Sequence, residues 1–278
     1  MNYQSKSKVW SWVPSLYFAE GLPYAFVMIV SVVLYKKIGI SNSEIALYTS
    51  WLYLPWVIKP LWSPFIDLIK TKRYWIILTQ LIIGASLAVI AFSIPTNSML
   101  QYTLAFFWLM AFSSSTHDIA ADGFYMLGLS SHDQSWFIGI RNSFYRFAIL
   151  FSQGILVIFA GQLENFYGNI KIAWAVIFGI LSFMFLVLAF YHKWALPIPQ
   201  NDKNNTSKTA KVIGKKYFEV VKDFFNKPGI LLIIIFILLY RFGEAQLVKI
   251  APLFMLDSYE SGGLNLSTSE YGFIYGTL

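Results

Sequence analysis

The sequence predicts an all-α protein that crosses a membrane several times. Hydrophobic residues make up 57% of the 278 residues and charged residues only 13%, whereas a soluble domain has about 25% charged residues. The mean hydropathy is +0.57. The apolar segments are about 20 residues or longer, which is the length that a helix needs to cross a bilayer. They do not alternate as the short strands of a membrane β-barrel do.

Charge and cysteine content exclude several other classes of protein. The chain contains no cysteine, so it has neither disulfides nor thiolate metal ligands. The net charge of +7 could suggest a nucleic-acid partner, but the cations gather in a few loops, as membrane topology requires. The N-terminus resembles a signal peptide because Lys6 and Lys8 precede an apolar run. That run is too long, is interrupted by Glu20 and lacks a cleavage site, so we expect a first spanning helix.

Six spans are expected before a polar gap. They cover residues 9–35, 43–69, 74–94, 99–129, 134–161 and 172–194. In the first span, Pro14 and Pro23 each remove a helical hydrogen bond, and a kink is expected there. The second span opens with the capping-box pattern Ser41-Asn42-Ser43-Glu44. It then contains three prolines, so we expect an irregular helix.

The polar gap at 197–227 sets the expected domains and orientation. Residues 201–207 are polar enough for a flexible linker, and 211–227 has apolar residues at helical spacing between lysines. We interpret that second part as a basic helix on the anionic cytoplasmic leaflet; a calmodulin-type target helix is the alternative. The expected domains are a six-helix bundle at 1–195, a cytoplasmic linker at 196–227 and the start of a second bundle at 228–278. The lysine-rich loops place the N-terminus in the cytoplasm.

Two pairs of similar segments indicate an internal repeat. A seventh span is expected at 229–256, and Leu16-Tyr17-Phe18-Ala19-Glu20-Gly21 resembles Leu239-Tyr240-Arg241-Phe242-Gly243-Glu244, 223 residues later. Ser41-Asn42-Ser43-Glu44-Ile45 resembles Ser267-Thr268-Ser269-Glu270-Tyr271, 226 residues later. Parallel repeats of six spans are the architecture of major facilitator transporters. Residues 267–278 are too few to cross a ~30 Å core, so we expect a truncated second bundle and no transport by this chain alone.

Two carboxylates stand inside the fourth span. Asp118 and Asp122 are four residues apart, so they share one helix face. Each would cost about 2.5–3.5 kcal/mol if it faced lipid, so we expect both to point inward. Counted from a turn near His132, Asp118 lies at the depth of Arg146, and Asp122 lies near the depth of Arg141. The pairs could be static ion pairs that lock the hairpin, or they could form a proton or substrate site.

Other polar residues are expected near the same depth. Glu20 lies about halfway along the first span, and Arg241 and Glu244 lie at comparable depth in the seventh. A central cavity lined by spans one, four, five and seven is therefore predicted. His117 could titrate, but a lone histidine beside small residues more often fills a packing position. We expect Lys59 to extend its side chain towards the membrane surface.

These motifs resemble a known family. The segments that carry the resemblance are Leu16-Tyr17-Phe18-Ala19-Glu20-Gly21-Leu22-Pro23, Trp62-Ser63-Pro64-Phe65-Ile66-Asp67, Ser115-Thr116-His117-Asp118-Ile119-Ala120-Ala121-Asp122, Tyr145-Arg146 and Leu239-Tyr240-Arg241-Phe242-Gly243-Glu244-Ala245. They are similar to AmpG-type muropeptide permeases of the major facilitator superfamily. The resemblance implies twelve helices in two bundles and proton-linked import of anhydromuropeptides. His117 and Gly123 depart from that pattern, as does Glu20, and residues 118–124 also resemble the related acetyl-CoA transporters.

The predicted function is therefore proton-coupled import of a small anionic solute, an anhydromuropeptide first, by a protein of the bacterial inner membrane. The expected partners are the solute, protons and the lipid bilayer, with no nucleic acid. We expect the complete protein to be a monomer, with no enzyme activity, no cofactor and no metal. The predicted site residues are Asp118, Asp122 and Glu20 for proton coupling, Arg146, Arg241, Glu244, His117 and Tyr145 for the solute, and Asp67, Lys70 and Arg73 as a conformational latch. In the predicted coupling step, deprotonated Asp118 pairs with Arg146, and protonation frees Arg146 for the anionic solute.

Three alternatives remain open at this stage. The solute could be acetyl-CoA or another organic anion. The Asp118-x-x-x-Asp122 spacing also suits a membrane-embedded, Mg²⁺-dependent prenyltransferase-like enzyme, since carboxylates and substrate phosphates hold Mg²⁺. Such an enzyme needs a second acidic cluster, and none is visible in the sequence. A structural or receptor-like role would predict no flux of any solute.

Overall fold

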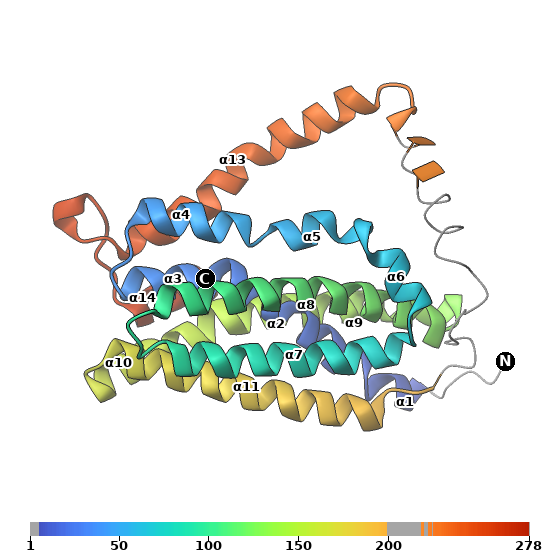
Figure 1. Cartoon of the computed structure of the whole chain (residues 1–278), viewed down its shortest axis with the longest axis horizontal. Helices are drawn as coiled ribbons and strands as arrows, with labels where there is room; N and C mark the ends of the chain where they lie inside the picture. Colours follow the sequence, from blue (N-terminus) through green and yellow to red (C-terminus); the bar gives the residue numbers. More distant parts are fainter. Residues whose placement is uncertain (1–5, 199–217, 220–221, 224, 278) are drawn as a thin grey trace.

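The computed structural model describes residues 6–198, 218–219, 222–223 and 225–277, and these residues form helices, turns and loops (Figure 1). Its helices are α1 (Lys6–Trp10), α2 (Val13–Ala25), η1 (Phe26–Val30), α3 (Ser31–Lys37), α4 (Asn42–Trp51), α5 (Leu54–Ile58), η2 (Lys59–Leu61), α6 (Ser63–Leu68), α7 (Lys72–Ser93), α8 (Met99–Gly128), α9 (Ser131–Leu150), η3 (Phe151–Leu156), α10 (Val157–Tyr167), α11 (Ile170–Ala195), α13 (Ile230–Leu256), η4 (Tyr259–Ser261) and α14 (Thr268–Thr277). Among the described residues, five continuous helical stretches are long and apolar enough to cross a membrane: Lys8–Lys37, Lys72–Ser93, Ser131–Tyr167, Ile170–Ala195 and Ile230–Leu256. The predicted all-α membrane class is confirmed. The six-helix bundle of a major facilitator stays a prediction.

Proline determines where the first two spans change geometry. Pro14 lies in the first turn of α2, Pro23 lies inside it, and the π-helical turn η1 follows directly. The kink expected at these prolines stays a prediction. In the second predicted span, Pro55, Pro60 and Pro64 each lie at the first or second residue of a new element, namely α5, η2 and α6. Proline fits the first helical turn because its missing N–H has no partner there anyway. The second span is therefore a chain of short helices, as predicted.

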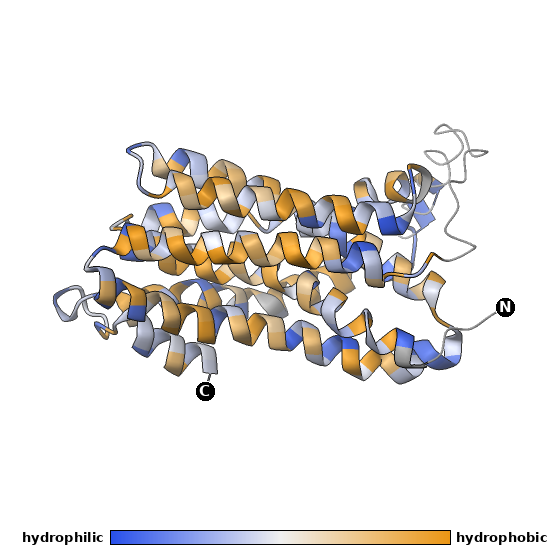
Figure 2. Ribbon diagram, turned by 90° about the horizontal axis from the view of Figure 1, so that it is seen from below, coloured by the Kyte–Doolittle hydropathy of each residue, from blue (hydrophilic) through white to orange (hydrophobic). Residues whose placement is uncertain are grey.

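The long helices pack in parallel and antiparallel directions around two clusters of apolar residues. α7 packs against both α8 and α11, and α2 packs against α9 (Figure 1). The larger cluster includes Phe26, Phe107 and Phe178, and the smaller one includes Trp12 and Phe124 near the N-terminal end. Figure 2 shows hydrophobic residues along the length of the helices, with hydrophilic residues near their ends and at several points within them.

The segment after the polar gap touches the rest of the chain at one end. α13 runs away from the bundle (Figure 1), and none of its most apolar stretch is buried. Near its C-terminal end, Asp257 pairs with Lys36 and accepts a 2.7 Å hydrogen bond from Asn42. Lys249 donates to the Thr49 hydroxyl over 3.1 Å. α13 therefore contacts the preceding helices mainly through its C-terminal end, which lies against the end of α3 and against α4.

α14 packs closely against η3 and α10. Ser267 caps it by accepting from the Glu270 N–H over 3.3 Å, and the Glu270 carboxylate accepts from the Ser267 N–H over 2.8 Å. Ser41 accepts from the Glu44 N–H in the same way at the start of α4, so both halves of the predicted repeat begin a helix with a related cap. The predicted basic helix at 211–227 lies largely outside the described residues, as does the linker at 201–207.

Candidate site: a charge cluster beside a cavity

Asp118 pairs with a lysine from the broken second span. Its Oδ2 atom lies 2.9 Å from Lys59 Nζ, and the Asp118 side chain is 15% exposed. The prediction that Asp118 pairs with Arg146 is therefore wrong. The prediction that Lys59 extends to the membrane surface is also wrong. Both errors have one cause: Lys59 begins the 3₁₀ turn η2, and this break in the second span lies against α8, which a count along the α8–α9 hairpin cannot show.

Asp122 pairs with Arg141, as their similar depth predicted. The Arg141 guanidinium lies 2.9 Å from Asp122 Oδ1. The same oxygen accepts a 3.1 Å hydrogen bond from the Tyr17 hydroxyl. The guanidinium also lies over two aromatic rings, 4.5 Å from the centroid of Tyr17 and 5.0 Å from that of Tyr125. Arg141 is therefore held by a carboxylate and by two ring faces, which attract a cation electrostatically.

Glu20 completes this group of charges. Its side chain is buried on α2 and interacts electrostatically with Asp118, Asp122 and Arg141. One of its oxygens, Oε2, is buried without a hydrogen-bond partner. We call Glu20, Lys59, Asp118, Asp122 and Arg141 the charge cluster. It contains three carboxyl groups and two permanent cations, so it carries one net negative charge if every carboxyl group is ionised.

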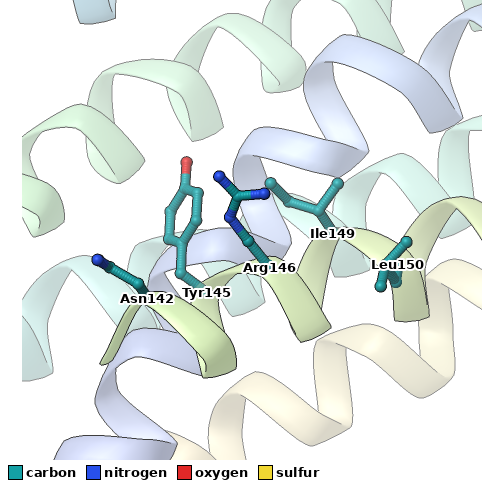
Figure 3. Close-up of a pocket in the computed structure, with 5 residues that line it drawn as sticks. All are labelled: Asn142, Tyr145, Arg146, Ile149 and Leu150. Carbon is teal, nitrogen blue, oxygen red and sulfur yellow. The ribbon is translucent and has the colours of Figure 1, made fainter. Parts of the chain in front are cut away.

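A cavity of about 590 Å³ opens beside the cluster. It is lined by Asn142, Tyr145, Arg146, Ile149 and Leu150, all from α9 (Figure 3). Figure 3 shows the Tyr145 hydroxyl and the Arg146 guanidinium pointing to the same side of α9. The Tyr145 hydroxyl also interacts electrostatically with Asp118 and Glu20. Arg146 is exposed and forms no ion pair with any described residue.

The position of Arg146 argues against lipid contact. It lies 15 residues after the start of α9, or about 22 Å along the helix at 1.5 Å per residue. An arginine at that depth faces a bundle interior or water rather than lipid, because insertion into hydrocarbon is costly. The cavity is therefore the place where this guanidinium meets water or a solute.

His117 lies away from the cavity. Its Nε2 atom is 2.9 Å from the Gln80 amide nitrogen, and the Gln80 amide oxygen is 3.0 Å from His192 Nδ1. His192 Nε2 is in turn 3.0 Å from the Ser15 hydroxyl. His117 and Asp118 are neighbours in sequence, so they point about 100° apart around α8. The contacts of His117 fit the packing interpretation rather than the predicted role in binding the solute.

The remaining predicted residues do not join the cluster. Glu244 is exposed on α13, and the side chains of Arg241 and Asp67 lie outside what the structure describes. Arg73 donates a hydrogen bond to the Lys193 carbonyl at the end of α11, and Lys70 lies 5.9 Å from the Tyr74 ring centroid. The charge cluster therefore comes from α2, η2, α8 and α9, whereas the cavity is lined by α9. Among the described residues, α13 contributes to neither.

The sequence contains one signal that would have found Lys59. A lysine inside an apolar, proline-rich run is subject to the same lipid penalty that singled out Asp118 and Asp122. Tyr17 carries a weaker signal, because it lies three residues before Glu20 and so shares its helix face. The sequence gives no signal that distinguishes Gln80 and His192 from ordinary packing residues.

Comparisons with known proteins identify the relatives of this chain. The Escherichia coli K12 protein named anhydromuropeptide permease is 24% identical over 94% of this chain and 50% of its own length. A Rickettsia prowazekii protein named putative transporter AmpG 3 is 25% identical over 79% of this chain and 53% of its own length. An uncharacterised Schizosaccharomyces pombe protein is 26% identical over 47% of this chain. This chain thus spans about half the length of the first two relatives. The model of the BT1 family matches residues 19–259, and the chain belongs to that family.

Proposed function

We propose that this chain carries the proton-binding and solute-binding groups of a secondary transporter that imports a small anionic solute. The main supporting observation is a partly buried cluster of three carboxyl groups and two cations beside a cavity that holds an exposed arginine. The names of the relatives make an anhydromuropeptide the first candidate for the solute. The positive loops favour a cytoplasmic N-terminus in the bacterial inner membrane.

The proton site in this proposal is the pair of Glu20 and Asp118. A net charge inside a membrane bundle is costly, so a cluster with two cations favours two ionised carboxylates and one that binds a proton. Asp118 and Asp122 each have a cation within 2.9 Å, and Glu20 has a buried oxygen without a partner. Glu20 is therefore the carboxyl group that holds the exchangeable proton, with Asp118 as its neighbour. Asp122 receives or releases that proton.

The solute site in this proposal is the cavity on α9. A guanidinium binds carboxylates and phosphates through two parallel hydrogen bonds, and Arg146 is available for this. Tyr145 and Asn142 add hydroxyl and amide groups at the same wall. The volume of about 590 Å³ lies in the usual range of small-molecule sites, about 300–1,000 Å³.

Coupling follows from the short path between the two sites. A solute carboxylate at Arg146 adds negative charge beside Tyr145, whose hydroxyl already lies in the field of Asp118 and Glu20. The added charge favours proton uptake by the cluster, so proton and solute bind together. This step replaces the Asp118–Arg146 pair with the Lys59–Asp118 pair and keeps the predicted joint loading of proton and solute.

The alternatives are less well supported by this geometry. Asp118 and Asp122 each hold a cationic side chain where a prenyltransferase would hold Mg²⁺, and among the described residues no group of three or more acidic or histidine ligands is arranged for a metal. Acetyl-CoA also presents phosphates, so it remains the second solute candidate.

A binding experiment tests the proposal on the purified 278-residue chain. We expect an anhydromuropeptide to bind, and we expect Arg146→Gln to weaken the affinity about tenfold or more, since a charged hydrogen bond contributes about 1.5–3 kcal/mol. Lys171→Gln is the matched control, because this exposed lysine lies at the start of α11 and does not line the α9 cavity. Tighter binding of acetyl-CoA would reverse the order of solutes. Binding of neither anion, or equal binding by Arg146→Gln, would contradict the proposal.

A further inference from the structure

A second cavity, of about 400 Å³, lies on the outside of the bundle between α7 and α11. These two helices run side by side along one edge of the molecule (Figure 1). The cavity is lined at one end by Thr71, Arg73 and Lys193, and along its length by apolar side chains that include Leu78, Leu81 and Phe190. None of its lining residues belongs to the charge cluster or to the α9 cavity.

The two cations lie at the same level of the bundle. Arg73 is at the start of α7 and Lys193 is near the end of α11, and the Arg73 guanidinium donates to the Lys193 carbonyl. Lys70 lies next to this end, over the ring of Tyr74. Among the residues that the structure describes, none that lines the cavity is acidic. This end of the cavity is therefore suited to an anion.

The rest of the cavity is suited to a hydrocarbon chain. From Arg73 to Leu81 the groove follows α7 for eight residues, or about 12 Å at 1.5 Å per residue. Phe190 is one turn before Lys193 on the membrane-spanning helix α11, and its side chain is 67% exposed on the outer face of the protein. A water-soluble anion would leave this apolar length unfilled, whereas an acyl chain would cover it.

We propose that this groove binds one phospholipid with an anionic headgroup. Its phosphate lies between Arg73 and Lys193, and one acyl chain lies along Leu78, Leu81 and Phe190. Basic groups between transmembrane helices recognise anionic lipid headgroups through the same combination of charge and apolar contact. Bound there, the lipid joins the start of α7 to the end of α11, the two helices that close one edge of the bundle.

The test compares two lipids that differ only in headgroup charge. Native mass spectrometry of the purified chain counts the bound lipids during titration with phosphatidylglycerol or with phosphatidylcholine of the same acyl chains. We expect one phosphatidylglycerol to bind at least fivefold more tightly, and we expect Lys193→Gln to lower that preference about fivefold, the contribution of one cation near an anionic surface. Lys193→Arg keeps the charge and should keep the preference.

Two further variants separate this site from general surface charge. Lys8→Gln removes a cation from another exposed position and should leave the lipid count and preference unchanged. Leu78→Trp keeps every cation but fills the groove, so it should remove the tightly bound lipid. An excess of inorganic phosphate should not displace the lipid, because the acyl contacts remain. Equal binding of the two lipids, loss of preference in Lys8→Gln, or displacement by phosphate would overturn the proposal.

Discussion

The pair of Lys59 and Asp118 makes a quantitative prediction about stability. At the observed 2.9 Å, the Coulomb attraction is roughly 6 kcal/mol for an effective dielectric constant of about 20, and desolvation of both ions opposes most of it. Removing one partner of a buried pair costs about 3–5 kcal/mol, because the other charge stays buried and unpaired. The Lys59 side chain is 34% exposed, so solvent screening reduces this cost to about 2–3 kcal/mol for Lys59→Met.

A double-mutant cycle measures the pair itself. The free energy of unfolding is determined by denaturation in mixed detergent micelles for Lys59→Met, Asp118→Asn and the double variant. Because Asp118→Asn removes the charge that Lys59→Met leaves behind, we expect the double variant to recover about 1–2 kcal/mol relative to the sum of the single changes. Lys171→Met, which removes an exposed lysine, is the control and should cost almost nothing. Additivity within about 0.5 kcal/mol would refute the inferred pair.

Three further predictions concern other parts of the molecule. Gly161→Ala should destabilise the chain by about 1–3 kcal/mol, because a Cβ atom there would lie 2.6 Å from the Ser269 backbone nitrogen of α14. Gly179→Ala, with open space around it inside α11, should not destabilise the chain in the same unfolding assay and should stabilise it by up to about 1 kcal/mol through helix propensity. Although desolvation acts in the opposite direction, hydrogen bonds from Lys36 and Asn42 lower the pKa of Asp257. The ionised Asp257 side chain therefore stabilises the fold fully above its unfolded pKa of about 4, and this stabilisation is lost as the pH falls through the lower folded value. The difference in unfolding free energy between the parent and Asp257→Asn should vanish in acid. Gln80→Leu should destabilise the chain by about 1–3 kcal/mol, because it leaves buried nitrogens of His117 and His192 without partners; a Gln80→Glu variant as stable as Gln80→Leu would contradict a role for hydrogen bonding there.

The sequence was sufficient for features that depend on local chemistry. The lengths of the apolar runs predicted the long helices, and the prolines predicted the breaks in the second span. Depth counting within the α8–α9 hairpin found the contact between Asp122 and Arg141, because antiparallel neighbours with a short turn have a fixed register. These predictions need no knowledge of how distant segments pack.

The parts that the sequence did not predict depend on tertiary packing. Lys59 reaches Asp118 because a 3₁₀ turn in the second span lies against α8, and no periodicity encodes that approach. The seventh span was expected to line the central cavity, but α13 contacts the first half mainly near Asp257 and Lys249. Helical spacing alone also could not say which face of α8 would meet Gln80 and which would meet Lys59.

The most direct test of the account measures the protons that accompany solute binding. Isothermal titration calorimetry of the purified chain with an anhydromuropeptide, in two buffers of different ionisation enthalpy, gives the number of protons exchanged per solute bound. The account predicts net proton uptake by the parent chain, and it predicts that Glu20→Gln still binds the solute but takes up no proton. Solute binding by the parent chain without any proton uptake would contradict the proposed link between the charge cluster and the Arg146 cavity.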